Sequence, residues 1–498
     1  MELNILERAI ASLAPTYAYN RCRARKALDL MLAYDGAAHS RRTAGWKRAG
    51  PASANTEARP AITALRERSR DLARNNAYGA RAISMIRNSM VGAGVIPVFK
   101  SKNKAKCRQL NELWQEWGEF GTQADFDGRG NIYSLMGLMA RTMAESGECI
   151  ALRHFVSGGR RRIPLEIQVL EPDHIDSSHD THARMRGQPF SCLGIEFDAR
   201  GKRAGYWLYD VHPGEGVSMA CPKLVPEREV IHLFRRDRPE QIRGIPWLAP
   251  CLMRLKDLDD YEDAQLLRQK IAACFCAFIT DVDGTASASD DDEELERLEP
   301  GRIDKLPVGR GITFASPPGA ENYDSYTRQV LRGIAVGTGL TYEMLSGDYS
   351  QVNFTSGRMG KADFWPELDM WQWQVFIPQA LAKIGEWFLD AAELGGFDTK
   401  GVHVDWVPPR RELVDPTKEI PALCKSVRSG FTSRQQTVRE LGYDPEAIEA
   451  EITEDNANAD EKGLIFDSDA RKTNNGGQAQ AEPATDKGGD GSAGDGQE

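Results

Sequence analysis

The most constraining feature of this sequence is a strand-rich segment between two stretches with helical periodicity. Residues 131–147 contain NIYSLMGLMARTMAES and predict a helix that runs directly into the apolar run ECIALRHF. Residues 148–243 then alternate short apolar strands with turns rich in Gly, Pro and Arg, and residues 244–275 return to apolar spacings of three and four. This order predicts two helices that enter and leave a compact β module, in the manner of a stalk with a cap.

The flanking parts of the 498-residue chain are predicted to be mainly helical. An amphipathic helix is expected over residues 59–91, and a very apolar helix that Pro366 and Pro378 would kink is expected around residues 364–388. The last residues, 471–498, contain seven Gly and no branched aliphatic or aromatic residue, so we predict that they are disordered. The predicted class is α+β and helix-dominated, in several units.

The composition excludes some classes of protein. The longest apolar run, residues 271–279, is about half the roughly 20 residues that a membrane-spanning helix needs. The first residues, MELNILERAI, lack the pattern of a signal peptide. Nine scattered cysteines are typical of reduced thiols and not of a disulfide framework. We therefore expect a protein that folds in a reducing compartment.

Charge is distributed unevenly along the chain. Residues 1–110 hold 21 Lys and Arg against 7 Asp and Glu, whereas the whole chain has a net charge of −10. The remaining 388 residues therefore carry a net charge of −24. A basic first fifth and an acidic body predict two surfaces with different partners.

The common signatures of enzymes are missing from the sequence. We find no phosphate-binding P-loop, no dinucleotide fingerprint, no HExxH and no GxSxG. One loop offers metal-ligand chemistry, because Asp173, His174, His179 and Asp180 lie close together in EPDHIDSSHD. A metal-dependent hydrolase using this 173–180 loop is the alternative function, and a polar turn is the simpler interpretation.

Two further patterns have open interpretations. Lys100, Lys102, Lys104, Lys106 and Arg108 form a basic run that either contacts phosphate or is a solvated loop. The tryptophans of the apolar helix are expected in the core or at a subunit interface; they are Trp365, Trp371, Trp373 and Trp387.

Several blocks spaced along the chain resemble one family. ALRERSRDLARNNAYGARAISMIRNSMVGAGVIP at residues 64–97 is similar to the lambda-type portal proteins of tailed bacteriophages. The blocks ESGECIALRHF, LEIQVLEPDHID, VIHLFRRDRPEQIRGIPWLAP and DWVPPRRELVDPTKE follow in that family's order. The resemblance covers about residues 20–460.

The resemblance implies a portal fold with wing, two-helix stem, β-containing clip and helical crown, assembled as a ring. Its domains are 1–59 basic N-terminal arm, 60–130 first part of the wing, 131–147 first stem helix, 148–243 clip, 244–275 second stem helix, 276–345 second part of the wing, 346–357 channel loop, 358–465 long kinked helix and crown, and 466–498 disordered tail.

The resemblance also implies a function. A homo-oligomeric ring of about twelve subunits would sit at one capsid vertex of the virion, after assembly in the host cytoplasm. It would pass double-stranded DNA during packaging and ejection, and it would dock the terminase large subunit, head–tail connectors, and major capsid and scaffold proteins. The chain would be no enzyme, with no catalytic residue, metal or cofactor and no membrane contact.

Twelve copies would carry a net charge of about −120, which suits a channel that repels DNA phosphates and lets DNA slide. We expect the acidic residues Asp257, Asp259, Asp260, Glu262 and Asp263 to line this channel. In the channel loop, the residues expected near DNA are Asp348, Tyr349, Gln351 and Asn353.

Overall fold

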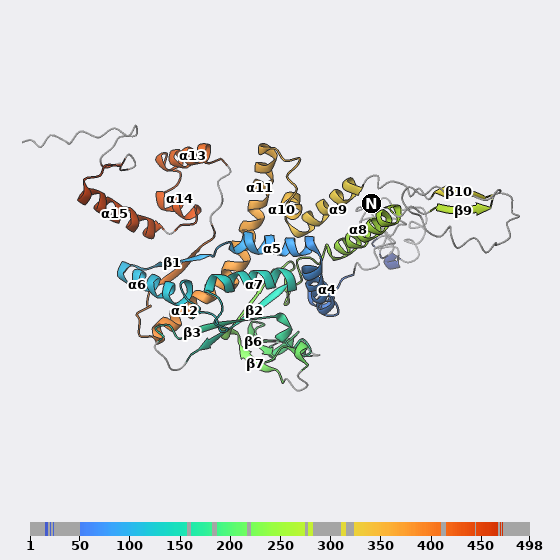
Figure 1. Cartoon of the computed structure of the whole chain (residues 1–498). Coiled ribbons are helices and arrows are strands. Elements are labelled where there is room, and N and C mark those ends of the chain that lie inside the picture. Colours follow the sequence, from blue (N-terminus) through green and yellow to red (C-terminus); the bar gives the residue numbers. More distant parts are fainter. Residues whose placement is uncertain are drawn as a thin grey trace, which may run out of the picture. The chain divides into compact units, whose positions relative to one another are not determined.

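The computed structural model describes most of the chain between residues 50 and 466 (Figure 1). The described ranges are 50–156, 161–181, 187–216, 221–273, 277–281, 310–314, 323–409, 415–443 and 445–466, with residues 15–17, 20, 23, 469 and 471. Most of the predicted basic arm, the acidic stretch at 282–300 and the predicted disordered residues 472–498 lie outside these ranges. Contacts divide the chain into Met1–Glu57 and Ala58–Glu498. The elements below belong to the second unit, except that α3 (Ala54–Ala58) begins in the first.

The helix predicted over residues 59–91 is two helices, α4 (Ile62–Asn75) and α5 (Ala77–Val91). Asn76 separates them because its backbone is extended and its side chain accepts a hydrogen bond from the Gly79 N–H at 2.7 Å. An asparagine at this position caps a new helix more readily than it continues an old one. The prediction of one continuous helix was therefore wrong at this residue.

Helix α7 (Ile132–Ser146) leads into an antiparallel sheet. Its strands are β2 (Glu148–Phe155), β3 (Leu165–Leu170) and β8 (Val230–Phe234), in the order β3-β2-β8. Gly147 joins α7 to β2 with a φ of +90°, and a Cβ there would lie 2.5 Å from the Ile245 carbonyl carbon. The turn therefore requires glycine on both conformational and steric grounds.

The segment predicted to be strand-like, residues 148–243, also contains a second antiparallel sheet. Its strands follow one another as β4 (Phe190–Cys192), β5 (Ile195–Phe197), β6 (Arg203–Leu208) and β7 (Lys223–Pro226). The single-turn helices of this region are η3 (Pro172–His174), η4 (Pro213–Glu215) and η5 (Glu227–Glu229).

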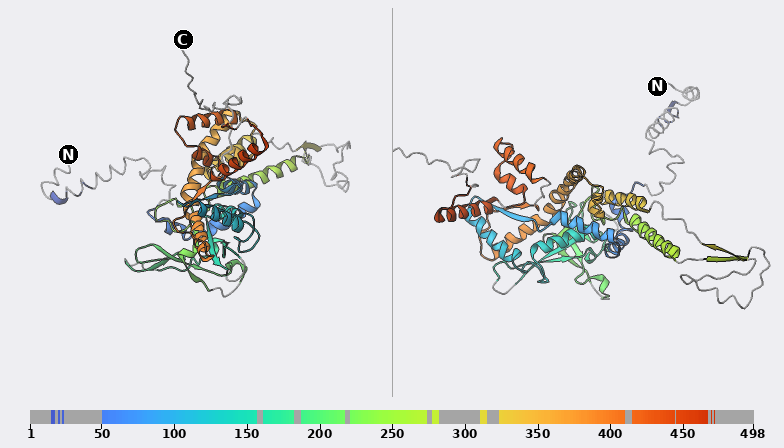
Figure 2. Two further views of the ribbon diagram at one scale, coloured as in Figure 1. Left: turned by 90° about the vertical axis from the view of Figure 1, so that its left-hand side faces the viewer. Right: turned by 45° about the horizontal axis from the view of Figure 1, so that its top comes forward.

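The helix expected from residue 244 begins later, as α8 (Leu252–Ala273), because prolines 246 and 250 hold the preceding residues in turns. It packs against α4 and α9 (Tyr323–Thr338), as Figures 1 and 2 show. The ring centroids of Tyr261 on α8 and Tyr326 on α9 are 4.5 Å apart. Strands β9 (Ala277–Asp281) and β10 (Arg310–Phe314) pair antiparallel between these two helices in the chain.

Helix α7 differs from α8 in its packing. Its side chains at Ile132, Met136, Met139 and Met143 are fully buried, and it contacts α4, α5 and β2. It meets the start of α8's segment through the Trp247 N–H, which donates to the Ala144 carbonyl at 3.0 Å. The helices that α8 mainly packs against are α4 and α9.

The apolar helix predicted around residues 364–388 is one long helical run. It consists of α11 (Phe354–Asp369), the π-helical stretch η7 (Met370–Leu381) and α12 (Ala382–Leu394). Pro378 lies inside η7, where a wider turn accommodates a residue that has no N–H and whose ring crowds the preceding turn. Pro366, the other proline expected to kink the helix, lies inside α11.

The main core gathers aromatic side chains from distant parts of the chain. Trp114 lies between Trp117, Phe388 and Trp406, with ring centroids 5.1–5.7 Å apart. Here α6 (Lys104–Trp114), η2 (Gln115–Glu119) and α12 meet the sheet of β1 (Ile96–Lys100) and β11 (His403–Val407). The remaining helices are α10 (Tyr342–Ser346), α13 (Pro416–Arg428), α14 (Arg434–Glu440) and α15 (Pro445–Lys462). The α+β, helix-dominated class is confirmed.

Candidate functional site

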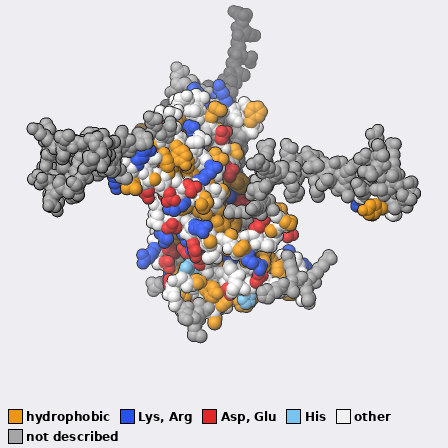
Figure 3. Space-filling model, turned by 90° about the vertical axis from the view of Figure 1, so that its right-hand side faces the viewer, with side chains coloured by type: hydrophobic (Ala, Val, Ile, Leu, Met, Phe, Trp, Pro, Cys, Tyr) orange, Lys and Arg blue, Asp and Glu red, His pale blue; other side chains and the backbone are white. Residues whose placement is uncertain are grey.

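The five acidic residues expected to line a channel all lie on α8, but they do not share one face. Asp257, Asp260 and Asp263 are exposed and spaced by three residues, which places them along one side of the helix. Asp260 also forms an ion pair with Lys256 at 2.7 Å. On the face seen in Figure 3, acidic side chains lie among basic and hydrophobic ones.

The other two acids are directed into the protein. Asp259 accepts a hydrogen bond from the Asn76 amide at 2.6 Å, next to the break between α4 and α5. Glu262 hydrogen-bonds Tyr323 of α9, and burial together with the neighbouring carboxylates of Asp259 and Asp263 raises its pKa. Both residues therefore attach α8 to its neighbours.

The four residues of the loop 346–357 that were expected near DNA also fall into two groups, those with partners inside the loop region and those exposed to solvent. Asp348 accepts a hydrogen bond from the Tyr342 hydroxyl at 3.1 Å, and Asn353 forms a capping box with Ser356 at the start of α11. Tyr349, 61% exposed, and Gln351 face solvent. Only the latter two have side chains that are not used to shape the loop.

The residues of the alternative metal site do not converge. The carboxylate of Asp173 pairs with Arg66 and Arg70, and Asp180 pairs with Arg59. His174 is buried with Nδ1 2.8 Å from the Tyr209 carbonyl oxygen, whereas the His179 ring stacks on Trp207, 3.9 Å between centroids. Each side chain is held by a different partner, so the loop is the polar turn of the simpler interpretation.

A different trio places ligand-type atoms together. Glu171, Asp173 and His212 offer oxygen and nitrogen atoms within 4.8 Å of one another, the one such cluster among the described residues. Arg70 already pairs with both carboxylates, at 2.9 Å to Glu171. A guanidinium occupies the position at which a cation would bind, and the cluster is therefore an ion-pair network.

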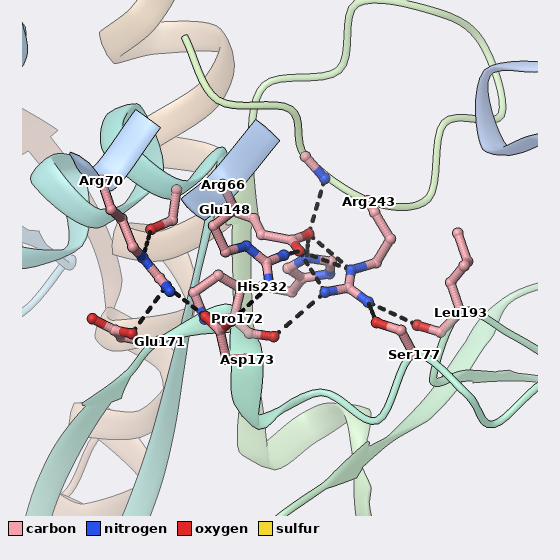
Figure 4. Close-up of polar contacts among 12 residues, drawn as sticks. Arg66, Arg70, Glu148, Glu171, Pro172, Asp173, Ser177, Leu193, His232 and Arg243 are labelled. Atoms are coloured by element: carbon pink, nitrogen blue, oxygen red, sulfur yellow. Dashed lines mark hydrogen bonds and ion pairs between the residues drawn. The ribbon is translucent and has the colours of Figure 1, made fainter. Parts of the chain in front are cut away.

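The most elaborate polar arrangement is centred on Glu148, at the start of β2, and Figure 4 shows it. The Glu148 side chain is fully buried and accepts hydrogen bonds from Arg243, Arg66, His232 and the Gly244 N–H. Arg243 Nε lies 2.9 and 3.0 Å from the two carboxylate oxygens. Burial alone would raise the pKa of Glu148, but Arg243 and His232 hold it well below its usual value of 4.5.

The network extends from Glu148 to other elements. Arg243 Nη1 donates to the Ser177 hydroxyl and to the Leu193 carbonyl, both at 2.9 Å. Arg66 also pairs with Asp173, which Arg70 contacts in turn (Figure 4). Helix α4, strands β2 and β8, the loop beside β4 and the segment before α8 are thus joined through one carboxylate.

The protonation of His232 follows from its two neighbours. Arg203 Nη1 lies 2.6 Å from His232 Nδ1, and arginine can only donate, so Nδ1 accepts and the proton is on Nε2. That Nε2–H donates to Glu148 at 2.9 Å. Burial lowers the pKa of His232 to about 4, and the charges of Arg203 and Arg243 add to the effect against the opposing pull of Glu148.

Apart from Asp173, the residues of this network were not predicted from the sequence. The one residue whose sequence context indicates such a network is Glu148, a charged residue at the start of the apolar strand ECIALRHF. A carboxylate within a buried strand needs cationic partners, but nothing local identifies Arg243, 95 residues away.

Some of the remaining predicted residues have ordinary structural roles. In the basic run, Lys100 pairs with Asp405 and Lys106 with Asp398. Trp371 and Trp387 are core residues, as expected, whereas Trp373 is 54% exposed. Within the part of the chain that the structure describes, no helix has both the length and the apolar character to cross a membrane.

Comparison with known proteins places this chain among viral structural proteins. Residues 39–372 match the family model described as phage portal protein, lambda family. The chain is 26% identical over 426 residues to a protein named "Probable portal protein" of Halomonas phage phiHAP-1, covering 78% of this chain and 79% of that one. It is 22% identical over 447 residues to portal protein B of Escherichia phage lambda, covering 79% and 83%. A solved structure titled as the virion of a native gene transfer agent particle is 15% identical with a TM-score of 0.47, covering 77% of this chain and 94% of that chain.

Proposed function

Because the chain belongs to the lambda family of phage portal proteins, we propose that it assembles into a ring of about twelve subunits at one vertex of a capsid. The ring is the conduit for double-stranded DNA during packaging and ejection. It also docks the terminase large subunit and, later, the head–tail connectors, while capsid and scaffold proteins contact its outer surface. The family match over residues 39–372 carries this proposal. The named relatives are structural portal proteins and not enzymes.

We assign the portal domains on the basis of packing. The predicted boundaries of the arm, the channel loop, the crown and the tail are kept as proposed. For the stem, the burial of α7 and the contact between α8 and α9 favour α8 with α9 over the pair at 131–147 and 244–275. The β9–β10 pair between them is then the β-containing element at the end of the stem.

The proposal for the channel wall is narrowed to the exposed acids of α8. Asp257, Asp260 and Asp263 lie on solvent-accessible positions, whereas Asp259 and Glu262 are engaged within the subunit. Repulsion between these carboxylates and DNA phosphates lets the duplex slide without binding. Tyr349 and Gln351 are the loop residues that we place next to DNA.

The native mass of the purified full-length protein tests this function. Twelve subunits of 55.3 kDa give a particle of about 660 kDa in light scattering, and negative-stain images should show rings with a central hole. A protein that stays at 55.3 kDa even when co-produced with its scaffold and capsid proteins would contradict the proposal.

A further inference from the structure

The three C-terminal helices have almost no core of their own. Among the described residues of 415–466, burial is limited to Pro445 and Ala459. Helices α13 and α14 contain no buried residue at all. A segment of about 50 residues with so little buried surface cannot offset the entropy that folding costs, so these helices need a partner surface.

Apolar side chains on this segment mark where such a partner binds. Phe431, between α13 and α14, is 86% exposed, and Ile420 on α13 is half exposed. Beyond the end of α15, Ile465 is 61% exposed and Phe466 52%. Exposed apolar residues therefore lie near both ends of the segment, on and after α13 and just after α15.

The charges of the two ends are complementary. Helices α13 and α14 together contain five basic and two acidic residues, a net charge of +3. Helix α15 contains seven acidic residues and one lysine, a net charge of −6. Glu451, Glu454 and Glu461 are exposed at spacings of three and seven, so they form an acidic stripe along one side of the helix.

We propose that this segment completes its packing against a second copy of the chain, with α15 of one subunit docked on α13–α14 of the next. Two different, complementary surfaces on one chain give a head-to-tail contact, and such a contact closes into a ring when repeated around an axis. The inference rests on the proposed ring and adds to it the surfaces that join neighbouring subunits at this end.

A second copy fits these observations better than DNA does. A duplex would be attracted to α13–α14 but repelled by the acidic stripe of α15, which would leave the apolar residues beside that stripe uncovered. A neighbouring subunit covers both surfaces at once. Within one subunit α15 already contacts α14, where Gln435 lies 3.5 Å from Glu449, but Glu451, Glu454 and Glu461 are exposed, so the acidic stripe remains available for the neighbour.

Charge reversal in the full-length chain tests the contact. The two double variants are Glu451→Lys with Glu454→Lys, and Lys425→Glu with Arg434→Glu. We expect each to raise the subunit concentration at which rings dissociate by about tenfold, because two exposed ion pairs are lost and replaced by repulsion between like charges. A chain that carries all four reversals restores opposite charges across every contact and should regain ring stability. Lys202→Glu and Glu215→Lys, exposed residues of the β region, are the matched controls.

A covalent test does not depend on charge. Cys424 on α13 is exposed, and Asn458→Cys places a second thiol beside the acidic stripe of α15. In a Cys221→Ser background, which removes the other exposed thiol of the described residues, a bismaleimide reagent should then link this variant into covalent dimers and higher multimers. The background alone, and Asn458→Cys combined with Cys424→Ser in it, should not form them.

The outcomes separate this inference from the proposed function. Two results would overturn the inference but not the proposed function. The wild type could form rings while the charge reversals change ring stability no more than the control variants do. Alternatively, rings of the chain with all four reversals could be no more stable than rings with either pair of reversals. A loss of binding to a DNA duplex in Lys425→Glu with Arg434→Glu that the α15 reversals do not restore would also overturn it. A wild-type chain that forms no ring in the light-scattering experiment overturns both.

Discussion

Removing the guanidinium of Arg243 is the sharpest perturbation of the buried network. The change Arg243→Met keeps much of the side-chain volume but removes the hydrogen bonds from Nε to both oxygens of Glu148, at 2.9 and 3.0 Å. It also leaves the Leu193 carbonyl and the Ser177 hydroxyl without their donor. Glu148 remains fully buried with a charge that only Arg66, His232 and one backbone N–H still offset.

Breaking one partner of a buried ion pair lowers the free energy of unfolding by about 3–5 kcal/mol. We expect a loss in this range for Arg243→Met, measured as the shift in urea-induced unfolding followed by tryptophan fluorescence. Arg236→Met, at an exposed position seven residues earlier, is the matched control and should change stability by less than about 0.5 kcal/mol.

The double variant Glu148→Gln with Arg243→Met separates charge from packing. It removes the uncompensated carboxylate, so it should be more stable than Arg243→Met alone, with a coupling energy that a double-mutant cycle measures. A loss below about 1 kcal/mol for Arg243→Met, or strictly additive effects of the two changes, would refute the view that Glu148 depends on Arg243.

Three further predictions concern His232 of the same network, the turn at Gly147 and the acids of α8. The pKa of His232 is about 4 in the folded protein and 6.5 when unperturbed, so as the pH falls the unfolded chain binds the proton first. The free energy of unfolding should therefore be highest above pH 6.5 and should fall by about 3 kcal/mol toward pH 4. Urea midpoints measured across this range should show the decrease, and His232→Gln should make it smaller. Gly147→Ala should cost about 1–3 kcal/mol through its positive φ and the close Ile245 carbonyl, more than Gly128→Ala, which has open space, in the same unfolding assay. Changing the three exposed acids of α8 to Asn should slow DNA packaging or leave DNA stuck in rings of unchanged mass, and unchanged packaging would contradict their proposed role in the channel.

Local periodicity predicted the elements whose burial follows their own sequence. The helix expected at residues 131–147 is α7, because its apolar residues recur at helical spacing and nearly all of them are buried. The region after Gly147 that was predicted to be strand-like likewise contains two antiparallel sheets. The break at Asn76 was missed because one polar residue in a helical stripe looks tolerable until its side chain is seen to cap the next helix.

Contacts between distant segments could not be predicted in this way. Nothing in the sequence of α8 indicates that it packs beside α9, more than 50 residues later, and not beside α7. The sequence predicted the same role for the five acidic residues of α8 because all five side chains carry a negative charge. Their actual roles depend on which neighbouring helix each side chain faces. Asp259 reaches Asn76 on one side and Glu262 reaches Tyr323 on another.

Near the start of α8, the network around Glu148 combines a local sequence feature with contacts between distant segments. Arg243 and the Gly244 N–H, just before the segment that leads into α8, both bind Glu148, and Gly147 lies against Ile245 at the same place. The residues that lead into the proposed stem are thus fixed to the sheet by a charge pair and a glycine contact. If α8 lines a channel, the force that DNA exerts on it is transmitted to the body of the subunit through Glu148 and Arg243. The hydrogen bonds of this pair are directional, so they fix the position of Arg243 relative to the sheet.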